Sequence, residues 1–121
     1  MVVSPDDFKS HSERIEDYED EIARRCAISR RYYYIFHLLR EENNPHSQSY
    51  FNYGPGDHGE ASSFIQRVGY KNLADDLDDL RDARNEADYD IDDNISDLDL
   101  ATFCCDFDDF ISEAKRRNFI P

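Results

Sequence analysis

Apolar residues recur along the chain three or four positions apart, and no segment alternates convincingly in the way of a strand. The most regular stripe begins at Lys71 and continues to about Tyr89. It consists of Leu73, Leu77, Leu80, Arg84 and Ala87. These positions share one side of a helix. The pattern therefore predicts a helix whose buried side includes an arginine.

Two helices are predicted before this segment. The letters SPDD at residues 4–7 form a helix start, because Ser4 can cap, Pro5 suits the first turn and two aspartates favour the positive end of the helix dipole. This first helix either breaks near residues 17–20 or runs on. The segment from residue 22 to ENNP at 42–45 is the clearest helix. Two apolar stripes lie on it: Ile22, Cys26, Tyr33 and Phe36, and Ile28, Tyr32, Ile35 and Leu39. So wide an apolar arc predicts a central helix with neighbours on more than one side.

Residues 46–59 are predicted to form a loop, because they hold three of the four glycines and follow Pro45. Two histidines of this loop, His46 and His58, are possible ligands or loop residues without a role. A short helix is expected over residues 59–70, ending near Gly69.

The final helix is predicted to follow a turn at residues 90–97, where Ser96 and Asp99 have the spacing of a capping box. Its expected inner side is Leu100, Phe103, Phe107, Phe110 and Ala114, and its expected end is the basic run 115–117. Together the elements predict an all-α fold: a four- or five-helix up-and-down bundle formed by one domain over residues 1–121.

The negative charge of the chain limits the classes of function that it can have. The net charge is −14, and residues 72–109 hold fifteen acids against Arg81 and Arg84. Such a chain repels nucleic acid at long range, so any contact with RNA requires a local basic feature. An aspartate-rich, lysine-poor surface has three interpretations: halophilic adaptation to high salt, mimicry of a nucleic-acid backbone, or a docking face for a basic partner.

The three cysteines, Cys26, Cys104 and Cys105, indicate free thiols in a cytoplasmic protein, because their number is odd and two are adjacent. The sequence has no CxxC spacing, no apolar run of membrane-spanning length and no signal-peptide pattern. No metal site and no cofactor are therefore expected, and no membrane association.

Three segments resemble the HEPN superfamily (higher eukaryotes and prokaryotes nucleotide-binding domains). AISRRYYYIFHLL at 27–39 looks like the second-helix signature of its small stand-alone members. DHGEASSFI at 57–65 resembles the start of the following helix, and LRDARNEADYDI at 80–91 resembles the late-helix motif in which Arg and Asn precede a His. The segments occur in the family's order and span about residues 20–115.

The resemblance implies a helical bundle that pairs as a homodimer. In ribonuclease members of the family, the motif Arg holds the phosphate of the cleaved bond and the His transfers a proton at the dimer interface, without a metal. On this chain, Arg84 and Asn85 match the first half of the motif. Tyr89 stands where His is expected, and a phenol with a pKa near ~10 is a poor general base. Asp88 is another base for this position, but it adds negative charge beside the phosphate.

Other residues are possible contributors to the site. His37 and His58 are imidazoles that can replace the missing one, and each can equally be a structural or loop histidine. Arg30, Arg31 and Tyr33 belong to an Arg- and Tyr-rich run that is either packing or a nucleic-acid surface.

The favoured hypothesis is an HEPN-like component of a prokaryotic toxin–antitoxin or antiviral defence system. It would bind or cleave RNA through a groove centred on Arg84 at the dimer interface, and any cleavage would be metal-independent. A nucleotidyltransferase is a possible partner, by analogy with the family, with Tyr89 as a conceivable target for modification. The alternative is a non-catalytic dimerisation or adaptor module whose acidic face docks a protein. Nucleotide binding without hydrolysis is a third hypothesis, although no Gly-rich phosphate loop supports it.

Overall fold

The structure is a computed structural model that describes residues 4–15, 20–40 and 57–121. In these ranges it is helical and contains no strand, which confirms the all-α prediction. The helices are α1 (Pro5–Ile15), α2 (Glu21–Arg40), α4 (Asp57–Arg67), α5 (Lys71–Tyr89) and α6 (Asp97–Arg116).

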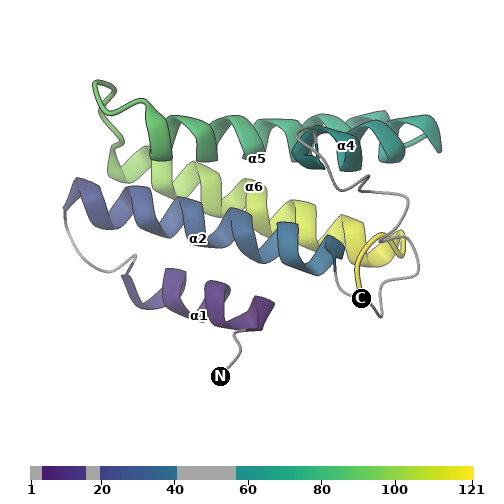
Figure 1. Ribbon diagram of the computed structural model, residues 1–121, viewed down its shortest axis with the longest axis horizontal. Helices are drawn as coiled ribbons and strands as arrows, with labels where there is room; N and C mark the ends of the chain where they lie inside the picture. Colours follow the sequence, from purple (N-terminus) through teal and green to yellow (C-terminus); the bar gives the residue numbers. More distant parts are fainter. Residues whose placement is uncertain (1–3, 16–19, 41–56) are drawn as a thin grey trace.

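The long helices form an up-and-down arrangement (Figure 1). Helices α2 and α6 run in one direction, whereas α1 and α5 run in the other. Helix α2 is central, since it packs against α1, α5 and α6, while the short α4 packs against α5. These three neighbours explain why the apolar arc predicted for the second helix is so wide.

The helix ends follow local chemistry. The Ser96 hydroxyl accepts a hydrogen bond from the Asp99 amide, and the Asp99 carboxylate accepts one from the Ser96 amide, so the predicted capping box opens α6. Gly69 has a φ of 103° in the turn between α4 and α5, a conformation that side chains disfavour. One boundary was wrong: α4 begins at Asp57, so the last residues of the expected loop are helical.

The core lies between α2, α5 and α6. Every residue predicted for the inner sides of α5 and α6 is buried, including Arg84, and the second stripe of α2 is buried with them. The prediction for the first stripe of α2 was wrong at Ile22, whose side chain is 67 % exposed. Ile22 lies in the first turn of α2, where a side chain can point past the neighbouring helices.

Two arginines of α2 fasten the turn between α5 and α6. The Arg25 guanidinium donates to the carbonyls of Glu86 (3.1 Å), Ala87 (2.9 Å) and Asp90 (3.1 Å), and also to that of Asp93. Arg24 Nε donates to the Ile95 carbonyl at 2.7 Å. The Ala87 carbonyl belongs to the last turn of α5, where carbonyls lack partners within the helix, whereas the Glu86 carbonyl also accepts from the Asp90 amide. Arg25 therefore acts as a C-terminal cap supplied by another helix.

In the described part of the chain, no helix is both long enough and apolar enough to span a membrane.

Candidate functional site

The predicted motif arginine lies in a cage of aromatic rings. The guanidinium carbon of Arg84 is 4.9 Å from the ring centre of Tyr32, 5.6 Å from that of Tyr33 and 5.9 Å from that of Tyr89. Tyr32 and Tyr33 come from α2, whereas Tyr89 ends α5. Cation–π attraction at these distances compensates part of the cost of burying a cation. Arg84 is only 5 % exposed, as its position on the apolar stripe predicted.

A carboxylate completes this environment. Arg84 Nη1 lies 3.7 Å from Asp88 Oδ2, one helical turn further along α5. The same oxygen accepts a hydrogen bond of 3.2 Å from the Ser29 hydroxyl of α2. Ser29 therefore helps to hold the acid that faces the arginine.

The Nε–H donor of Arg84 is unused. The Nε of Arg84 is buried and has no hydrogen-bond partner within the described part of the chain. A buried donor without an acceptor costs about 1–3 kcal/mol, so proteins seldom leave one unless something else satisfies it.

The tyrosines of the cage differ in environment. Burial is the main cause that raises the pKa of Tyr32 to about 12, although the nearby Arg84 acts in the opposite direction. Tyr32 is therefore a neutral phenol and not a base at neutral pH. Tyr33 is half-buried, and Tyr89 is 69 % exposed at the end of the helix. Asn85, the second motif residue, is half-buried next to Arg84.

His37 lies beside the cage, on the next turn of α2 after Tyr33. Its ring stacks on Phe8 of α1 with centroids 4.8 Å apart, and it lies 6.1 Å from the Tyr33 ring. Burial, with a smaller contribution from the positive charge of Arg40, lowers the pKa of His37. The imidazole is thus held neutral and packed between rings, with Tyr33 connecting it to the arginine.

Arg30 and Arg31 do not form a joint basic surface. Arg31 is 7 % exposed, and its guanidinium donates at 2.8 Å to the Ser12 hydroxyl, which in turn donates to the Ala27 carbonyl. It lies 5.8 Å from the Phe107 ring centre and so belongs to the packing of α1, α2 and α6. Arg30 is half-buried on a different side of α2. Consecutive residues of a helix point about 100° apart, which explains the separation.

The two remaining histidines give no further information. His58 belongs to the first turn of α4, but its side chain lies outside the described residues, and His46 lies outside them altogether. Within the described ranges, no group of three or more His, Cys, Asp or Glu side chains is placed to hold a metal ion.

Two contributors to the site were not predicted as site residues. Ser29 and Tyr32 both contact the Arg84–Asp88 pair. A signal for Ser29 was present, because Ser29, Tyr33 and His37 are spaced by four residues and share one face of α2. Tyr32 was expected either as packing or as part of a nucleic-acid surface beside Arg30 and Arg31, but not as a neighbour of Arg84.

Comparisons of the chain with models of protein families, with curated proteins and with solved structures give no match. The resemblance to HEPN proteins therefore stays a prediction that rests on the motif residues.

Proposed function

We propose that this chain is an HEPN-like, RNA-binding component of a prokaryotic toxin–antitoxin or antiviral defence system, in which two copies meet over Arg84. The observation that carries the proposal is the buried Arg84 with its unused Nε–H. An arginine held by rings and one carboxylate is a preorganised cation, and a guanidinium is the side chain best suited to a phosphate. Because the Nε is buried, a phosphate oxygen or a group from a second copy would supply the missing acceptor only after the side chains around Arg84 move aside.

The residues around Arg84 favour binding over cleavage. Tyr89 takes the place of the proton-transferring His of the motif, and the Asp88 side chain faces the arginine. A phenol transfers protons poorly at neutral pH. The chain would then hold RNA, or regulate a partner that acts on it, without fast cleavage of its own.

The direct test is Tyr89→His, which restores the family motif. Tyr89 is largely exposed, so the substitution leaves the core intact. We expect the wild-type protein to bind labelled total RNA, and Tyr89→His to cleave it in the presence of a chelator. Both proteins would be assayed at low and at molar salt, after circular dichroism and sizing.

Two matched variants sharpen this test. Tyr89→Phe removes only the hydroxyl and should bind RNA without cleaving it. Arg84→Lys in the Tyr89→His background keeps the charge but loses the guanidinium fork, and it should abolish cleavage. Arg84→Ala is unsuitable as the first variant because the side chain is buried. If folded Tyr89→His cleaves nothing and the wild-type protein binds no RNA under any condition, the proposal is wrong.

A second function, a non-catalytic adaptor, is favoured by the acidic side of the molecule. Burial raises the pKa of Asp76 on α5, and so do the charges of Asp79, Asp106, Asp75 and Asp109. The carboxylates of α5 and α6 thus converge on one surface, where they repel one another. A basic protein segment docked there would relieve this repulsion.

The adaptor is tested with a synthetic Lys/Arg-rich peptide in place of the partner. Binding should weaken with rising salt and fall at least fivefold in the double variant Asp76→Asn, Asp79→Asn. The control Asp92→Asn, Asp93→Asn changes the net charge equally in the turn between α5 and α6. Equal losses in both variants would mean general charge attraction and would contradict a defined docking face.

A further inference from the structure

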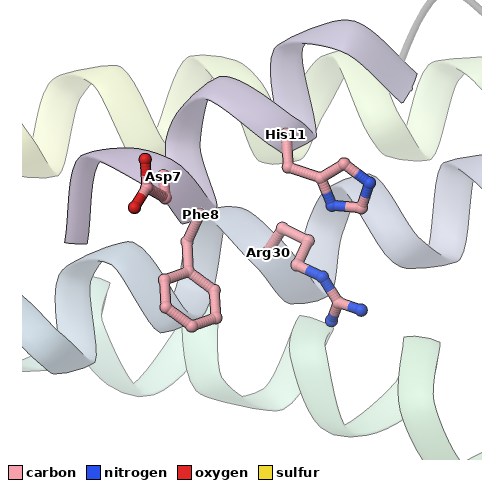
Figure 2. Close-up of a pocket in the computed structure, with 4 residues that line it drawn as sticks. All are labelled: Asp7, Phe8, His11 and Arg30. Atoms are coloured by element: carbon pink, nitrogen blue, oxygen red, sulfur yellow. The ribbon is translucent and has the colours of Figure 1, made fainter. Parts of the chain in front are cut away.

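An open pocket of about 190 Å³ lies between α1 and α2. The described residues that line it are Asp7, Phe8 and His11 of α1 and Arg30 of α2. Figure 2 shows the Phe8 ring on one side and the ends of His11 and Arg30 on the other, with the Asp7 carboxylate pointing away from Arg30. The pocket thus has an apolar side and a basic side.

The apolar side is rigid. The Phe8 ring stacks on His37 at 4.8 Å and lies 6.4 Å from the Tyr33 ring, so it is held by contacts with two residues of α2. A wall already fixed by packing loses little freedom when a ligand binds, which favours affinity.

The basic side has unused donors. The side chains of Arg30 and His11 make no hydrogen bond or ion pair with any residue in the described ranges. The contrast with other arginines of α2 is clear, because Arg24, Arg25 and Arg31 all donate to protein oxygens. Asp7 lines the same pocket but forms no ion pair with Arg30 in the described ranges, so this half-buried arginine beside an apolar wall is available to an external anion.

The size and charge of the pocket limit its ligand. An enclosed apolar cavity of about 150 Å³ holds one benzene, so the present volume suits one ring and a small anionic group. A guanidinium binds a carboxylate through two parallel hydrogen bonds. A dianion such as a phosphate monoester would meet Asp7 and the negative field of the whole chain with a single arginine to offset them.

We infer that this pocket binds a small monocarboxylate that carries one ring-sized apolar group. The carboxylate pairs with Arg30 and accepts from His11, while the ring lies against Phe8. The inference does not use Arg84 and stands apart from the proposed RNA binding.

The test is a titration of the ¹⁵N-labelled full chain with phenylacetate, followed by NMR. We expect saturable shifts of the amides of Phe8, His11 and Arg30. Arg30→Gln should weaken binding at least tenfold. Arg14→Gln removes the same charge from an exposed position of α1 and should change the affinity less than twofold.

Three ligands complete the design, and they remain informative even if Arg30→Gln does not fold. Benzyl alcohol keeps the ring without the charge, and acetate keeps the charge without the ring, so each should bind at least tenfold more weakly than phenylacetate. Adenosine monophosphate carries a ring on a dianion and should also bind more weakly. The inference is overturned by absent shifts at 10 mM phenylacetate, by equal losses in the two arginine variants, or by tighter binding of any of the three ligands.

Discussion

The guanidinium carbon of Arg84 lies 4.9 Å from the centre of the Tyr32 ring, and both side chains are buried. This contact joins α5 to the central helix at the level of the predicted motif. The arginine is thus part of the core as well as part of the candidate site. Substituting it tests both roles at once, so the structural effect has to be measured first.

We predict that Arg84→Ala lowers the free energy of unfolding by about 2–4 kcal/mol, because it removes the cation–π contacts and leaves Asp88 without its cation. Urea denaturation followed by circular dichroism measures this. Arg81→Ala is the control: Arg81 lies on the same helix, is more exposed and lies 3.9 Å from Asp78. Arg81→Ala should lower the free energy of unfolding by less than about 1 kcal/mol, because an exposed ion pair contributes little to stability. Equal stability of Arg84→Ala and the wild type would contradict the cage.

Arg25→Met should also destabilise the fold. The substitution keeps the apolar stem but removes the donors to four carbonyls of the α5 end and the following turn. We expect the free energy of unfolding to fall by about 2–3 kcal/mol, since the buried Ala87 carbonyl then lacks a partner and three part-buried hydrogen bonds are lost. The amides of residues 91–95 should exchange faster with solvent. Arg30→Met on the same helix has no described protein partner to lose and should leave both quantities nearly unchanged.

His37 should make the fold sensitive to mild acid. Burial lowers its pKa in the folded state, so the unfolded chain takes up a proton at a higher pH than the folded chain does. The contribution of His37 to the free energy of unfolding is fully present above about pH 7.5. It falls as the pH decreases through the pKa of the unfolded state, near ~6.5, towards the lower pKa of the folded state. The groups against it are Phe8, Tyr33, Phe36 and the cation Arg40.

Chemical denaturation of the wild type and His37→Gln between about pH 7.5 and pH 5.5 isolates this contribution. The difference in unfolding free energy between the two proteins should shift in favour of the variant as pH falls. Taking the difference removes the effect of the aspartates, which both proteins share. A difference that does not change with pH would show that His37 accepts its proton as easily in the fold as outside it.

Helical periodicity predicted most of the architecture, because each long helix has neighbours that bury a continuous stripe. Leu73, Leu77, Leu80, Arg84 and Ala87 are all buried as their spacing predicted. The prediction that Ile22 is buried was wrong, because a continuous stripe requires a neighbouring helix along its whole length. The predicted start of α4 was also wrong, because the glycines before and after Asp57 suggested a loop.

The candidate site was predictable only in part. Arg84, Asn85, Asp88 and Tyr89 lie on one helix, so their proximity follows from spacing alone. The contribution of Ser29 and Tyr32 required the packing of α2 on α5, which no local pattern contains. Arg30 and Arg31 looked equivalent in the sequence. In the structure, Arg30 lines an open pocket, whereas Arg31 donates a hydrogen bond to Ser12 inside the bundle.

The hydrogen bonds of Arg25 also have a consequence for the order of folding. They join positions 61 to 68 residues apart in the chain, so they cannot form until the intervening segment has closed a long loop. Helices α5 and α6 can approach each other early through their short connection, but the end of α5 is fixed only when α2 docks. The docking of α2 is therefore the step that couples the two halves of the chain, and it is expected to make unfolding a single cooperative transition.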